Sequence, residues 1–473
     1  MLQLQSIWEK LNNICCLTDS YKVSHYLQYP PGTQYVYSYF EPRSKAKFSE
    51  FVFFGLQYYI SEYLRGPVVT AEKIRYAKKL YKDHFGKEVF NESGWRYILD
   101  KYNGHLPVRI KAVAEGTVIP ISNVAMTIEN TDPRCYWLTN YLETLLVQLW
   151  YGSTVATQSR EMKKIILKYL HKTGTPELID FKLHDFGFRG VSSVETAAMG
   201  GAAHLLNFKG TDTTPAIILA KEIYGCKMAG FSIPAAEHST ITSWGIDRES
   251  DAYENMLDKY PDGMVAVVSD SYDIYNACRC VWGSKKLKEK IMMRKGVLII
   301  RPDSGDPPTV VCEILQILWD VFGGKVNKKG YRVLDDHVRI IQGDGIDFEM
   351  LDAILFAMEK KGFSTDNIAF GSGGGLLQKL NRDTEDVAIK CCAITIDGVE
   401  KPVFKKPQTD LKKGSKQGRL ELVRWEGTYR TTENNKLNGV AIDAPGHLRD
   451  IFLDGRFRKR HKFDECRERC AVA

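Results

Sequence analysis

The sequence lacks the features of secreted, zinc-ribbon and membrane-spanning proteins. Its eleven cysteines include no Cys-x-x-Cys pair, so neither a zinc ribbon nor a disulfide framework is expected. No stretch approaches the roughly 18 consecutive apolar residues of a membrane span. Glu9, Lys10 and Asp19 interrupt the first twenty residues, which therefore do not read as a signal peptide. These absences predict a cytoplasmic protein in a reducing compartment, without a membrane partner.

The chain also has no large excess of charge of either sign. Lys and Arg number 65 against 58 Asp and Glu, which leaves a net charge of +7 over 473 residues. Such an excess permits an anionic substrate without demanding one. The charged tail 456–469 is interpreted as a solvated C-terminal helix or arm rather than a nucleic-acid-binding segment, because no nucleic-acid module is recognised. No nucleic-acid partner is expected.

Repeats of solenoid type and low-complexity tracts are missing too, and the composition is that of a globular protein. Hydrophobic residues make up 44% and charged residues 26% of the chain. A chain of this length is too long for one ordinary core. We therefore expect two domains, or one elaborated barrel with a flanking domain.

A repeated pattern fills the middle of the chain: a short apolar run, a polar or glycine-rich turn, then a segment with helical spacing. The apolar runs are 181–183, 265–268, 297–300, 338–341 and 367–370. Polar residues follow each run, and ligands bind at the carboxyl ends of parallel strands in α/β folds. We predict an α/β fold with an irregular (β/α) barrel-like domain over residues 154–385. An open doubly wound sheet is the alternative.

The two ends of the chain differ from this middle region. Residues 1–153 contain turn signals and a β-rich stretch at 108–128, and the chain after residue 390 returns to short strands with Lys-rich loops. We therefore expect 1–153 and 386–473 to form one α+β domain.

A glycine-rich loop, Gly371–Gly375, lies between an apolar run and a segment that reads as a helix start. Backbone N–H groups in such a turn can bind an anion, and Lys379, Arg382 and Lys390 follow closely in sequence. The loop matches neither the dinucleotide fingerprint nor the Walker A pattern. A glycine turn without a ligand is the alternative, but its position after a strand favours a phosphate site.

Two further loops place a carboxylate just beyond a strand, at Asp303 and Asp344. Two carboxylates on one rim can hold ribose hydroxyls or a hard cation such as Mg²⁺, completed by substrate phosphates and water. A single Asp in such a position is more often a helix N-cap. The presence of two, alongside Arg301 and Arg339, favours ligand binding.

His238 is surrounded by small and hydroxyl residues in the segment 232–240. Asp270, Asp273 and Asp303 are predicted at neighbouring strand ends, where they could orient one ring nitrogen. The other nitrogen would then be available as a base or a nucleophile. A structural role is the alternative for a lone histidine.

The segment His184–Gly190 combines aromatic residues with an arginine at a turn. A planar heterocycle can stack on Phe186, and Arg189 can meet a carbonyl or phosphate oxygen. The alternative places the aromatic residues in the core and Arg189 in an ion pair. Asp212, in the turn 210–213, adds a hydrogen-bond acceptor without a nearby counter-charge in sequence.

These motifs together resemble the nicotinamide phosphoribosyltransferase family, type II phosphoribosyltransferases related to nicotinate phosphoribosyltransferase. The resemblance runs in order from about residue 17 to 430. Its motifs are DSYKV from Asp19, HDFGFRGVSS from His184, KGTDT from Lys209, PAAEHSTIT from Pro234, SDSYDIY from Ser269, RPDSG from Arg301, QGDG from Gln342 and GSGGGLLQK from Gly371.

The resemblance implies a pentosyltransferase that converts nicotinamide and 5-phosphoribosyl 1-pyrophosphate to nicotinamide mononucleotide and pyrophosphate in NAD salvage. ATP hydrolysis would be coupled through a phosphohistidine at His238, with Asp273 and Asp303 as its catalytic partners or as neighbours of the metal site. Mg²⁺ is expected at Asp303 and Asp344. The family is homodimeric, with active sites shared across the interface.

The resemblance also assigns binding residues. Those expected at nicotinamide are Phe186, Tyr21 from the second subunit, Arg189, Asp212 and Ser232. Those expected at the phosphoribosyl and phosphate groups are Arg301, Asp303, Gly343, Asp344, Gly373, Gly374, Arg382, Arg43, Lys390 and Lys405.

Overall fold

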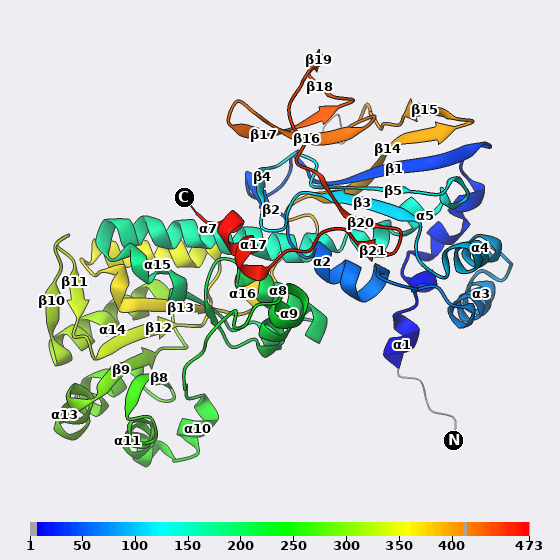
Figure 1. Cartoon of the computed structure of the whole chain (residues 1–473). Coiled ribbons are helices and arrows are strands. Elements are labelled where there is room, and N and C mark those ends of the chain that lie inside the picture. The colour runs from blue at the N-terminus through cyan, green and yellow to red at the C-terminus, as the bar shows by residue number, and fades with distance from the viewer. Residues whose placement is uncertain (1–6, 410–413, 473) are drawn as a thin grey trace, which may run out of the picture. The chain divides into compact units, whose positions relative to one another are not determined.

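The structure is a computed structural model that describes residues 7–409 and 414–472, so the first six residues of the N-terminal stretch lie outside the described residues. The chain divides into two compact units (Figure 1). Unit 1 comprises Met1–Thr157, Ile223–Gly225 and Asn381–Cys470, and unit 2 comprises Gln158–Glu222, Cys226–Leu380 and Ala471–Ala473. The division into functional domains at residues 153 and 386 stays a prediction.

Unit 2 is built on a six-stranded sheet in which every neighbouring pair of strands is parallel. In sheet order the strands are β7 (Gly210–Thr211), β6 (Leu183–Asp185), β13 (Ile368–Ser372), β12 (Val338–Gln342), β9 (Lys295–Arg301) and β8 (Asp262–Val268). Four of the five apolar runs predicted from the sequence fall on these strands at nearly the expected residues.

The two edges of this sheet are joined by one segment, 231–235. Gly210 of β7 forms a parallel bridge to Phe231, and Ala266 of β8 forms a parallel bridge to Ala235. The sheet therefore curls into a barrel-like form. The barrel-like prediction is confirmed, and the open doubly wound alternative is wrong.

The fifth run, 181–183, differs from its prediction. A 3₁₀ helix, η5 (Pro176–Phe181), occupies its start, and β6 extends through His184 and Asp185, which were expected in a turn. Pairing explains the shift, because Gly371 and Ser372 of β13 stand in register with these two residues. The turn therefore begins two residues later, at Phe186.

Helices cover the barrel-like sheet of unit 2 (Figure 1). They are α8 (Val194–His204), α9 (Thr214–Tyr224), α10 (His238–Thr242), α11 (Glu249–Lys259), α12 (Ile274–Asn276), the π-helix η8 (Ala277–Val281), α13 (Lys285–Met293), α14 (Pro307–Phe322), α15 (Phe348–Lys360) and α16 (Gly374–Leu377), preceded by the long α7 (Leu149–Thr173). A hairpin of β10 (Gly324–Val326) and β11 (Arg332–Leu334) follows α14. Asp306 and Asp347 cap α14 and α15, as the rule that Asp favours N-caps predicts.

Unit 1 contains a seven-stranded antiparallel sheet. In sheet order its strands are β15 (Val399–Pro402), β14 (Val387–Ile396), β1 (Thr33–Pro42), β5 (Met126–Asn130), β3 (Val108–Ala112), β20 (Arg449–Leu453) and β21 (Arg456–Phe457). Smaller sheets are formed by β2 (Glu50–Val52) with β4 (Val118–Pro120), and by β16 (Leu420–Trp425), β17 (Thr428–Glu433), β18 (Lys436–Leu437) and β19 (Val440–Ala441). The main helices are α1 (Ile7–Leu11), α2 (Leu56–Tyr59), α3 (Ala71–Phe85), α4 (Glu92–Tyr102), α5 (Leu138–Tyr141), α6 (Glu143–Leu146) and α17 (Phe463–Cys470). Strands from both ends of the chain share the large sheet.

The C-terminal tail packs into unit 1 and is not a solvated arm. In α17 the side chains of Phe463, Cys466 and Cys470 are fully buried. Arg469 donates from Nη1 to the carbonyl oxygen of Glu115 at 2.9 Å. These three buried residues are spaced i, i+3 and i+7, so they form an apolar stripe on a helix that is otherwise rich in charge.

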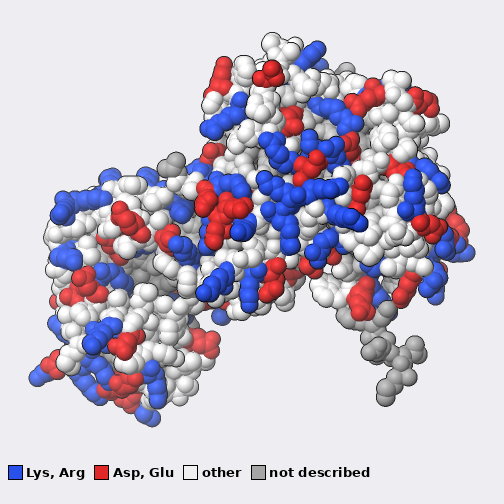
Figure 2. Space-filling view, in the orientation of Figure 1, with Lys and Arg blue, Asp and Glu red and all other residues white. Residues whose placement is uncertain are grey.

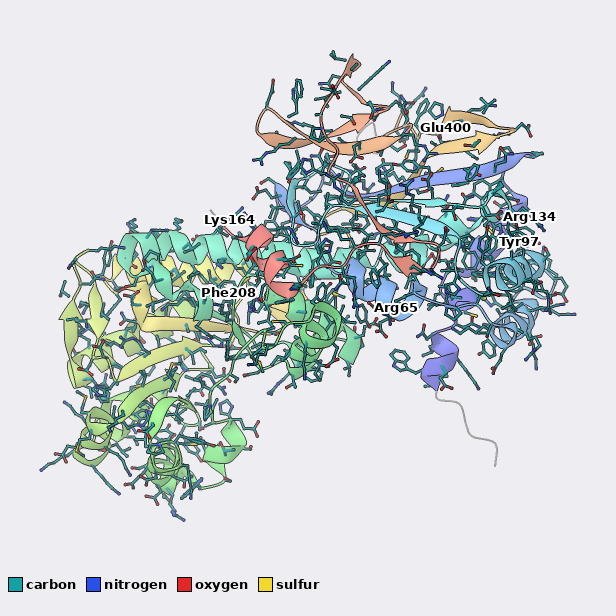
Figure 3. The ribbon with its side chains drawn as sticks, in the orientation of Figure 1. Arg65, Tyr97, Arg134, Lys164, Phe208 and Glu400 are labelled. Carbon is teal, nitrogen blue, oxygen red and sulfur yellow. The ribbon has the colours of Figure 1, made fainter. Side chains whose placement is uncertain are left out.

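The surface carries basic and acidic side chains intermixed over the face shown in Figure 2. Some charges lie on aromatic rings: in unit 1 the Arg134 guanidinium is 3.8 Å from the Tyr97 ring centroid (Figure 3). All eleven cysteines are free, and Cys280 in η8 is the one that is exposed among the described residues. Within those residues, every helix is too short or too polar to cross a membrane.

Candidate active site

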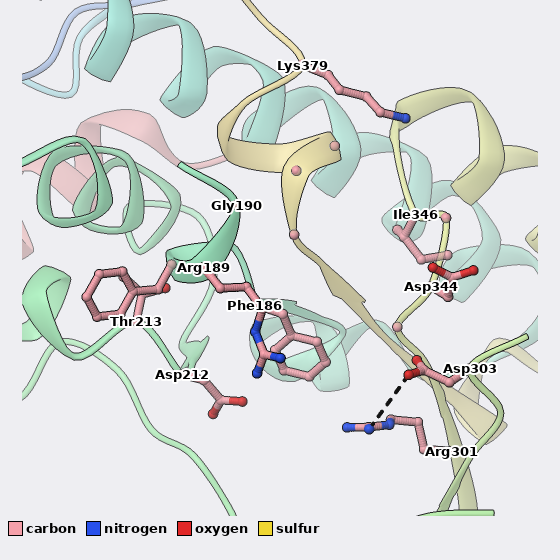
Figure 4. Close-up of a pocket in the computed structure, with 16 residues that line it drawn as sticks. Phe186, Arg189, Gly190, Asp212, Thr213, Arg301, Asp303, Asp344, Ile346 and Lys379 are labelled. Atoms are coloured by element: carbon pink, nitrogen blue, oxygen red, sulfur yellow. Dashed lines mark ion pairs between the residues drawn. The ribbon is translucent and has the colours of Figure 1, made fainter. Parts of the chain in front are cut away.

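The loops that follow the strands of unit 2 surround one cavity of about 890 Å³ (Figure 4). Nine of the predicted site residues line it: Phe186, Arg189, Asp212, Arg301, Asp303, Gly343, Asp344, Gly373 and Gly374. The other lining residues are Phe188, Gly190, Thr213, Gly345, Ile346, Gly375 and Lys379. Residues far apart in sequence are therefore brought to one rim, as the strand-end pattern predicts.

Phe186 presents a ring to this cavity from the end of β6. Its backbone N–H donates to Ser372 O at 2.9 Å, which fixes the ring beside β13. A Cβ on Gly371 would lie 2.0 Å from Cε2 of Phe186, so a glycine is required there. Arg189 lines the same cavity (Figure 4). A flat aromatic or heterocyclic ligand fits such an arrangement.

Asp212 is held at the same end of the cavity by two neighbours. Its backbone N–H donates to Asp185 O at 2.9 Å, and its Oδ1 accepts a hydrogen bond from Ser232 Oγ. Ser232 lines a second cavity of about 430 Å³ that also includes Phe186 and Asp212. The Asp212 carboxylate can accept a hydrogen bond from a ligand N–H and would repel a ligand carboxylate.

Asp185 is hydrogen-bonded to Asp212 through its backbone and was not among the predicted site residues. Its carboxylate is fully buried at the end of β6, and Oδ1 accepts from Gly187 N at 2.7 Å. Burial raises its pKa to about 6, and the charge of Asp212 adds to the rise. Asp185 thus joins the Phe186 turn to the Asp212 turn through its main chain and its side chain. It escaped prediction because it was expected inside a turn.

The second cavity lies inside the barrel-like sheet and is mostly apolar. Ala266, Ile299 and Ile341 form its buried core, with Phe186 and Ile233 packed against them. It shares Phe186, Asp212 and Arg301 with the larger cavity. The aromatic end of the site is therefore walled by apolar side chains on the inner side.

Carboxylates and an arginine line the other part of the larger cavity. Arg301 Nη2 lies 3.8 Å from Asp303 Oδ2, and the buried Arg301 Nε has no hydrogen-bond partner among the described residues. Burial raises the pKa of Asp303; the charges of Asp270 and Asp344 add to the rise, whereas Arg301 and His238 oppose it. A polyanionic ligand with a bound cation would satisfy both the unpaired guanidinium N–H and the crowded carboxylates.

Two glycine loops complete the rim. Ser372 Oγ donates to Ile346 O at 2.7 Å, which ties Gly373–Gly375 to Gly343–Ile346. A Cβ on Gly374 would meet nothing within 4 Å, so the backbone there is open to a ligand. Lys379 lies 3.7 Å from Asp347 Oδ2 and supplies a cation at this end. Loop openness and a nearby cation suit a phosphate group.

His238 is the first residue of α10, and Asp270 lies against it. His238 Nε2 is 3.0 Å from Asp270 Oδ1, while Asp270 Oδ2 accepts from Asp303 N at 3.1 Å and from Ser304 Oγ at 2.6 Å. Asp270 is nearly buried, whereas about half of the His238 side chain is exposed. The imidazole is therefore oriented on one edge and open to a ligand on the other.

Asp273, the second aspartate of this loop, caps a helix, and its catalytic role stays a prediction. Its Oδ1 accepts from Tyr275 N at 2.9 Å and from Asn276 N at 3.0 Å, as the N-cap of α12. The structure thus brings Asp270, rather than Asp273, into contact with His238. The two aspartates lie three residues apart in one loop, so their sequence positions could not show which of them contacts His238.

No cluster of three or more His, Cys, Asp or Glu side chains suited to a metal ion occurs in residues 7–409 and 414–472. The predicted Mg²⁺ site uses two carboxylates and relies on substrate phosphates for the remaining ligands. Asp303 and Asp344 both line the cavity and are close enough for one charge to raise the pKa of the other. This donor set fits such a shared cation.

Five predicted residues belong to unit 1, and their roles stay predictions. Tyr21 is exposed. Arg43 pairs with Asp386, Lys390 Nζ donates to Gly414 O at 3.2 Å, and Arg382 lies 3.8 Å from Asp383. The fifth residue is Lys405, whose backbone N–H donates to Ser415 Oγ at 2.8 Å.

Comparisons with known proteins agree on one family. Residues 181–442 match the model of the nicotinate phosphoribosyltransferase (NAPRTase) family, and residues 13–110 match the nicotinamide phosphoribosyltransferase N-terminal domain. The chain is 49% identical over 469 residues to a nicotinamide phosphoribosyltransferase of Xanthomonas campestris, covering 98% of this chain and 99% of that protein. It is 33% identical over 494 residues to one of Acinetobacter baylyi, covering 96% of each.

Solved structures show the same fold. A nicotinate-nucleotide pyrophosphorylase from Pyrococcus furiosus matches with a TM-score of 0.60 at 18% identity, covering 99% of this chain and 97% of that one. A human nicotinic acid phosphoribosyltransferase matches with a TM-score of 0.52 at 15% identity, covering 96% and 92%. At such low identity these likenesses carry the fold alone.

Proposed function

Since the chain belongs to the nicotinate phosphoribosyltransferase family, with nicotinamide phosphoribosyltransferases as its full-length relatives, we propose that it makes nicotinamide mononucleotide. The substrates are nicotinamide and 5-phosphoribosyl 1-pyrophosphate, and the second product is pyrophosphate. One observation carries the proposal: an aromatic end with Phe186, Arg189 and Asp212 and an anion-binding end with Arg301 and the glycine loops share one cavity. The reaction belongs to NAD salvage.

The reaction is a displacement at the anomeric carbon. The ring nitrogen of nicotinamide forms a bond to C1 of the ribose as the bond from C1 to the pyrophosphate oxygen breaks, and pyrophosphate leaves with the electron pair. Phe186 stacks on the pyridine ring, and Arg189 donates to the carboxamide oxygen. Arg301, whose buried Nε has no hydrogen-bond partner among the described residues, stabilises charge on the leaving group.

Asp212 selects the amide over the acid. Its carboxylate accepts a hydrogen bond from the carboxamide NH₂ of nicotinamide and repels the carboxylate of nicotinate. Ser232 holds Asp212 Oδ1 from the side of the second cavity. Recognition of the substrate therefore depends on a fixed negative charge.

Asp303 and Asp344 would hold Mg²⁺ together with the phosphates of the substrate. When bound, the cation neutralises negative charge that develops on pyrophosphate. The glycine loops Gly343–Gly345 and Gly373–Gly375 line the cavity in which these phosphate groups would bind.

ATP is a co-substrate that acts through His238. With its proton on Nε2, facing Asp270, the ring has a lone pair on Nδ1. Nδ1 bonds to the γ-phosphorus as the bond to the bridging oxygen breaks; ADP leaves with that electron pair, and Asp270 can accept the Nε2 proton. Water later cleaves the N–P bond, which releases phosphate and restores the imidazole.

We further propose a cytoplasmic homodimer with shared active sites. Tyr21 would cover the second face of nicotinamide from the partner subunit, and Arg43, Arg382, Lys390 and Lys405 would collect phosphates. An exposed tyrosine and basic residues placed in unit 1 support this assignment. Measurement of solution mass tests the dimer directly.

One assay tests the function. Purified protein is incubated with phosphoribosyl pyrophosphate, Mg²⁺ and either nicotinamide or nicotinate, with and without ATP, and mononucleotides are detected by mass. We expect product from nicotinamide and a higher rate with ATP. Preference for nicotinate would overturn the substrate assignment, and a His238→Ala variant that keeps full ATP stimulation would overturn the role of His238.

A further inference from the structure

The loop that carries Asp270 is closed at its base by a buried hydrogen bond. Trp282 Nε1 donates to Ser269 Oγ at 3.0 Å, across α12 and η8, and Ser269 Oγ donates to Val267 O at 3.0 Å. Both side chains are fully buried. We call the Trp282–Ser269 hydrogen bond the clasp. It brings Trp282, thirteen residues after Ser269 in sequence, back to the end of β8.

The indole of the clasp is itself held in place. The Tyr253 ring of α11 stacks on it with ring centroids 4.3 Å apart and an interplanar angle of 2°. Tyr253 is fully buried and donates from its hydroxyl to Glu249 Oε1 at 2.9 Å. A stacked, fully buried indole has little freedom to rotate, so its N–H has a fixed direction.

Ser269 links the fixed indole to Asp270, the next residue in the chain. Its backbone N–H donates to Arg301 O at 3.0 Å, and it directly precedes Asp270. Asp270 must reach His238 with Oδ1 and the backbone N–H of Asp303 with Oδ2 at the same time. A carboxylate satisfies two such partners only when its backbone is fixed. The clasp fixes the backbone at the residue that precedes Asp270.

We propose that Trp282 is a positioning residue: through Ser269 it holds Asp270 against His238 and thereby sets how strongly ATP accelerates the transferase reaction. This inference rests on the proposed function of His238. Trp282 and Ser269 line neither cavity. Their loss therefore disturbs the histidine and its carboxylate rather than the nicotinamide end of the site.

The test compares two variants that remove the clasp in different ways. Trp282→Phe keeps an aromatic ring for Tyr253 but deletes the N–H, and Ser269→Ala deletes the acceptor with almost no loss of volume. Trp95→Phe is the matched control, because Trp95 is equally buried and its Nε1 has no hydrogen-bond partner among the described residues. Rates with and without ATP, the KM for nicotinamide and Tm are measured for each.

We expect both clasp variants to lower the ratio of the rate with ATP to the rate without it about three- to tenfold, the effect of one lost hydrogen bond. The rate without ATP and the KM for nicotinamide should stay within about twofold of wild type. Trp95→Phe should lower Tm and leave the ratio unchanged. If Trp282→Phe does not fold, Ser269→Ala decides the matter.

Two outcomes would overturn the proposal. One is an unchanged ratio in Ser269→Ala or in a folded Trp282→Phe; the other is an equal fall in Trp95→Phe, which would indicate a general loss of stability. The wild-type protein separates this result from the proposed function: absence of any ATP stimulation in wild type would contradict the phosphohistidine step itself.

Discussion

Asp270 joins the His238 ring to the Asp303 loop: Asp270 Oδ1 lies 3.0 Å from His238 Nε2, while its Oδ2 accepts from the backbone N–H of Asp303. One carboxylate thus touches the histidine that is proposed to carry phosphate and the loop that is proposed to hold Mg²⁺.

The Asp270→Asn variant should lose most of its ATP stimulation. An amide is nearly the same size, but it cannot accept the Nε2 proton and bonds less strongly to an imidazolium. Loss of a charged hydrogen bond costs about 2 kcal/mol, which predicts a fall of about thirtyfold in the stimulation. Asp273→Asn is the matched control, because Asn caps a helix as well as Asp does. Equal falls in the two variants would return Asp273 to the role predicted from the sequence.

Replacement of Asp212 tests substrate choice. In Asp212→Ala the carboxamide loses its acceptor, so kcat/KM for nicotinamide should fall about ten- to hundredfold. The value for nicotinate should stay constant or rise, because the repelling charge is gone. Steady-state rates with both substrates measure the two changes in parallel. A loss of the same size for both pyridines would argue against a role in selection.

Gly371→Ala should disturb the aromatic face of the site. The added Cβ would lie 2.0 Å from the Phe186 ring, so the ring must move. Overpacking of this kind costs about 1–3 kcal/mol, and we expect the KM for nicotinamide to rise about tenfold. Steady-state rates at varied nicotinamide concentration and thermal unfolding measure the two effects.

A second change separates crowding from other effects of Gly371→Ala. Adding Phe186→Leu should restore Tm without restoring nicotinamide binding, since the crowded ring is then absent. If the double variant stays as unstable as the single one, contact with Phe186 is not the cause of the loss.

Asp185 predicts a pH dependence of stability. Its folded pKa of about 6 exceeds the ordinary value of 3.8, so the folded state keeps a proton that the unfolded state has lost between these two values. The cost of the buried charge is absent below about pH 3.8 and complete above about pH 6. Asp185→Asn keeps the acceptor for Gly187 N and removes the charge. It should therefore gain about 3 kcal/mol over wild type at pH 7.5 and about 1 kcal/mol at pH 4.5.

Asp132 in unit 1 is a control in which folding lowers the pKa of the carboxyl group instead of raising it. Burial raises its pKa, but hydrogen bonds from Lys101 and Tyr102 outweigh burial and lower it to about 2. Its contribution to stability is present above its unfolded pKa, so Asp132→Asn should destabilise the protein at pH 7.5. Urea unfolding at the two pH values measures both variants. A lower stability of Asp185→Asn at pH 7.5 would contradict the assigned pKa.

The strand-end pattern was sufficient to predict the fold and much of the site. Apolar runs such as 297–300 and 338–341 became β9 and β12, and the polar residues after them line one cavity because parallel strands end at one edge. Closure of the sheet was harder to predict. It depends on the segment 231–235, which pairs through two isolated bridges and has no strand pattern of its own.

The details that the sequence could not supply depend on local contacts. Asp270 and Asp273 share a loop, and their roles separate only once α12 takes Asp273 as its cap. Asp185 was hidden because β6 owes its length to pairing with β13 rather than to its own residues. In the tail, the many charged residues around Phe463 and Cys466 led to the expectation of a solvated helix or arm, whereas these two side chains are buried. The roles of Tyr21 and the basic residues of unit 1 stay predictions.

The exposed thiol of Cys280 offers a reporter for the Asp270 loop. It lies in η8, two residues before Trp282, while the other ten cysteines are buried or partly buried. A maleimide dye should therefore attach to this site before any other, without an engineered cysteine. Its fluorescence anisotropy would follow motion of the segment during turnover and register how ATP changes it.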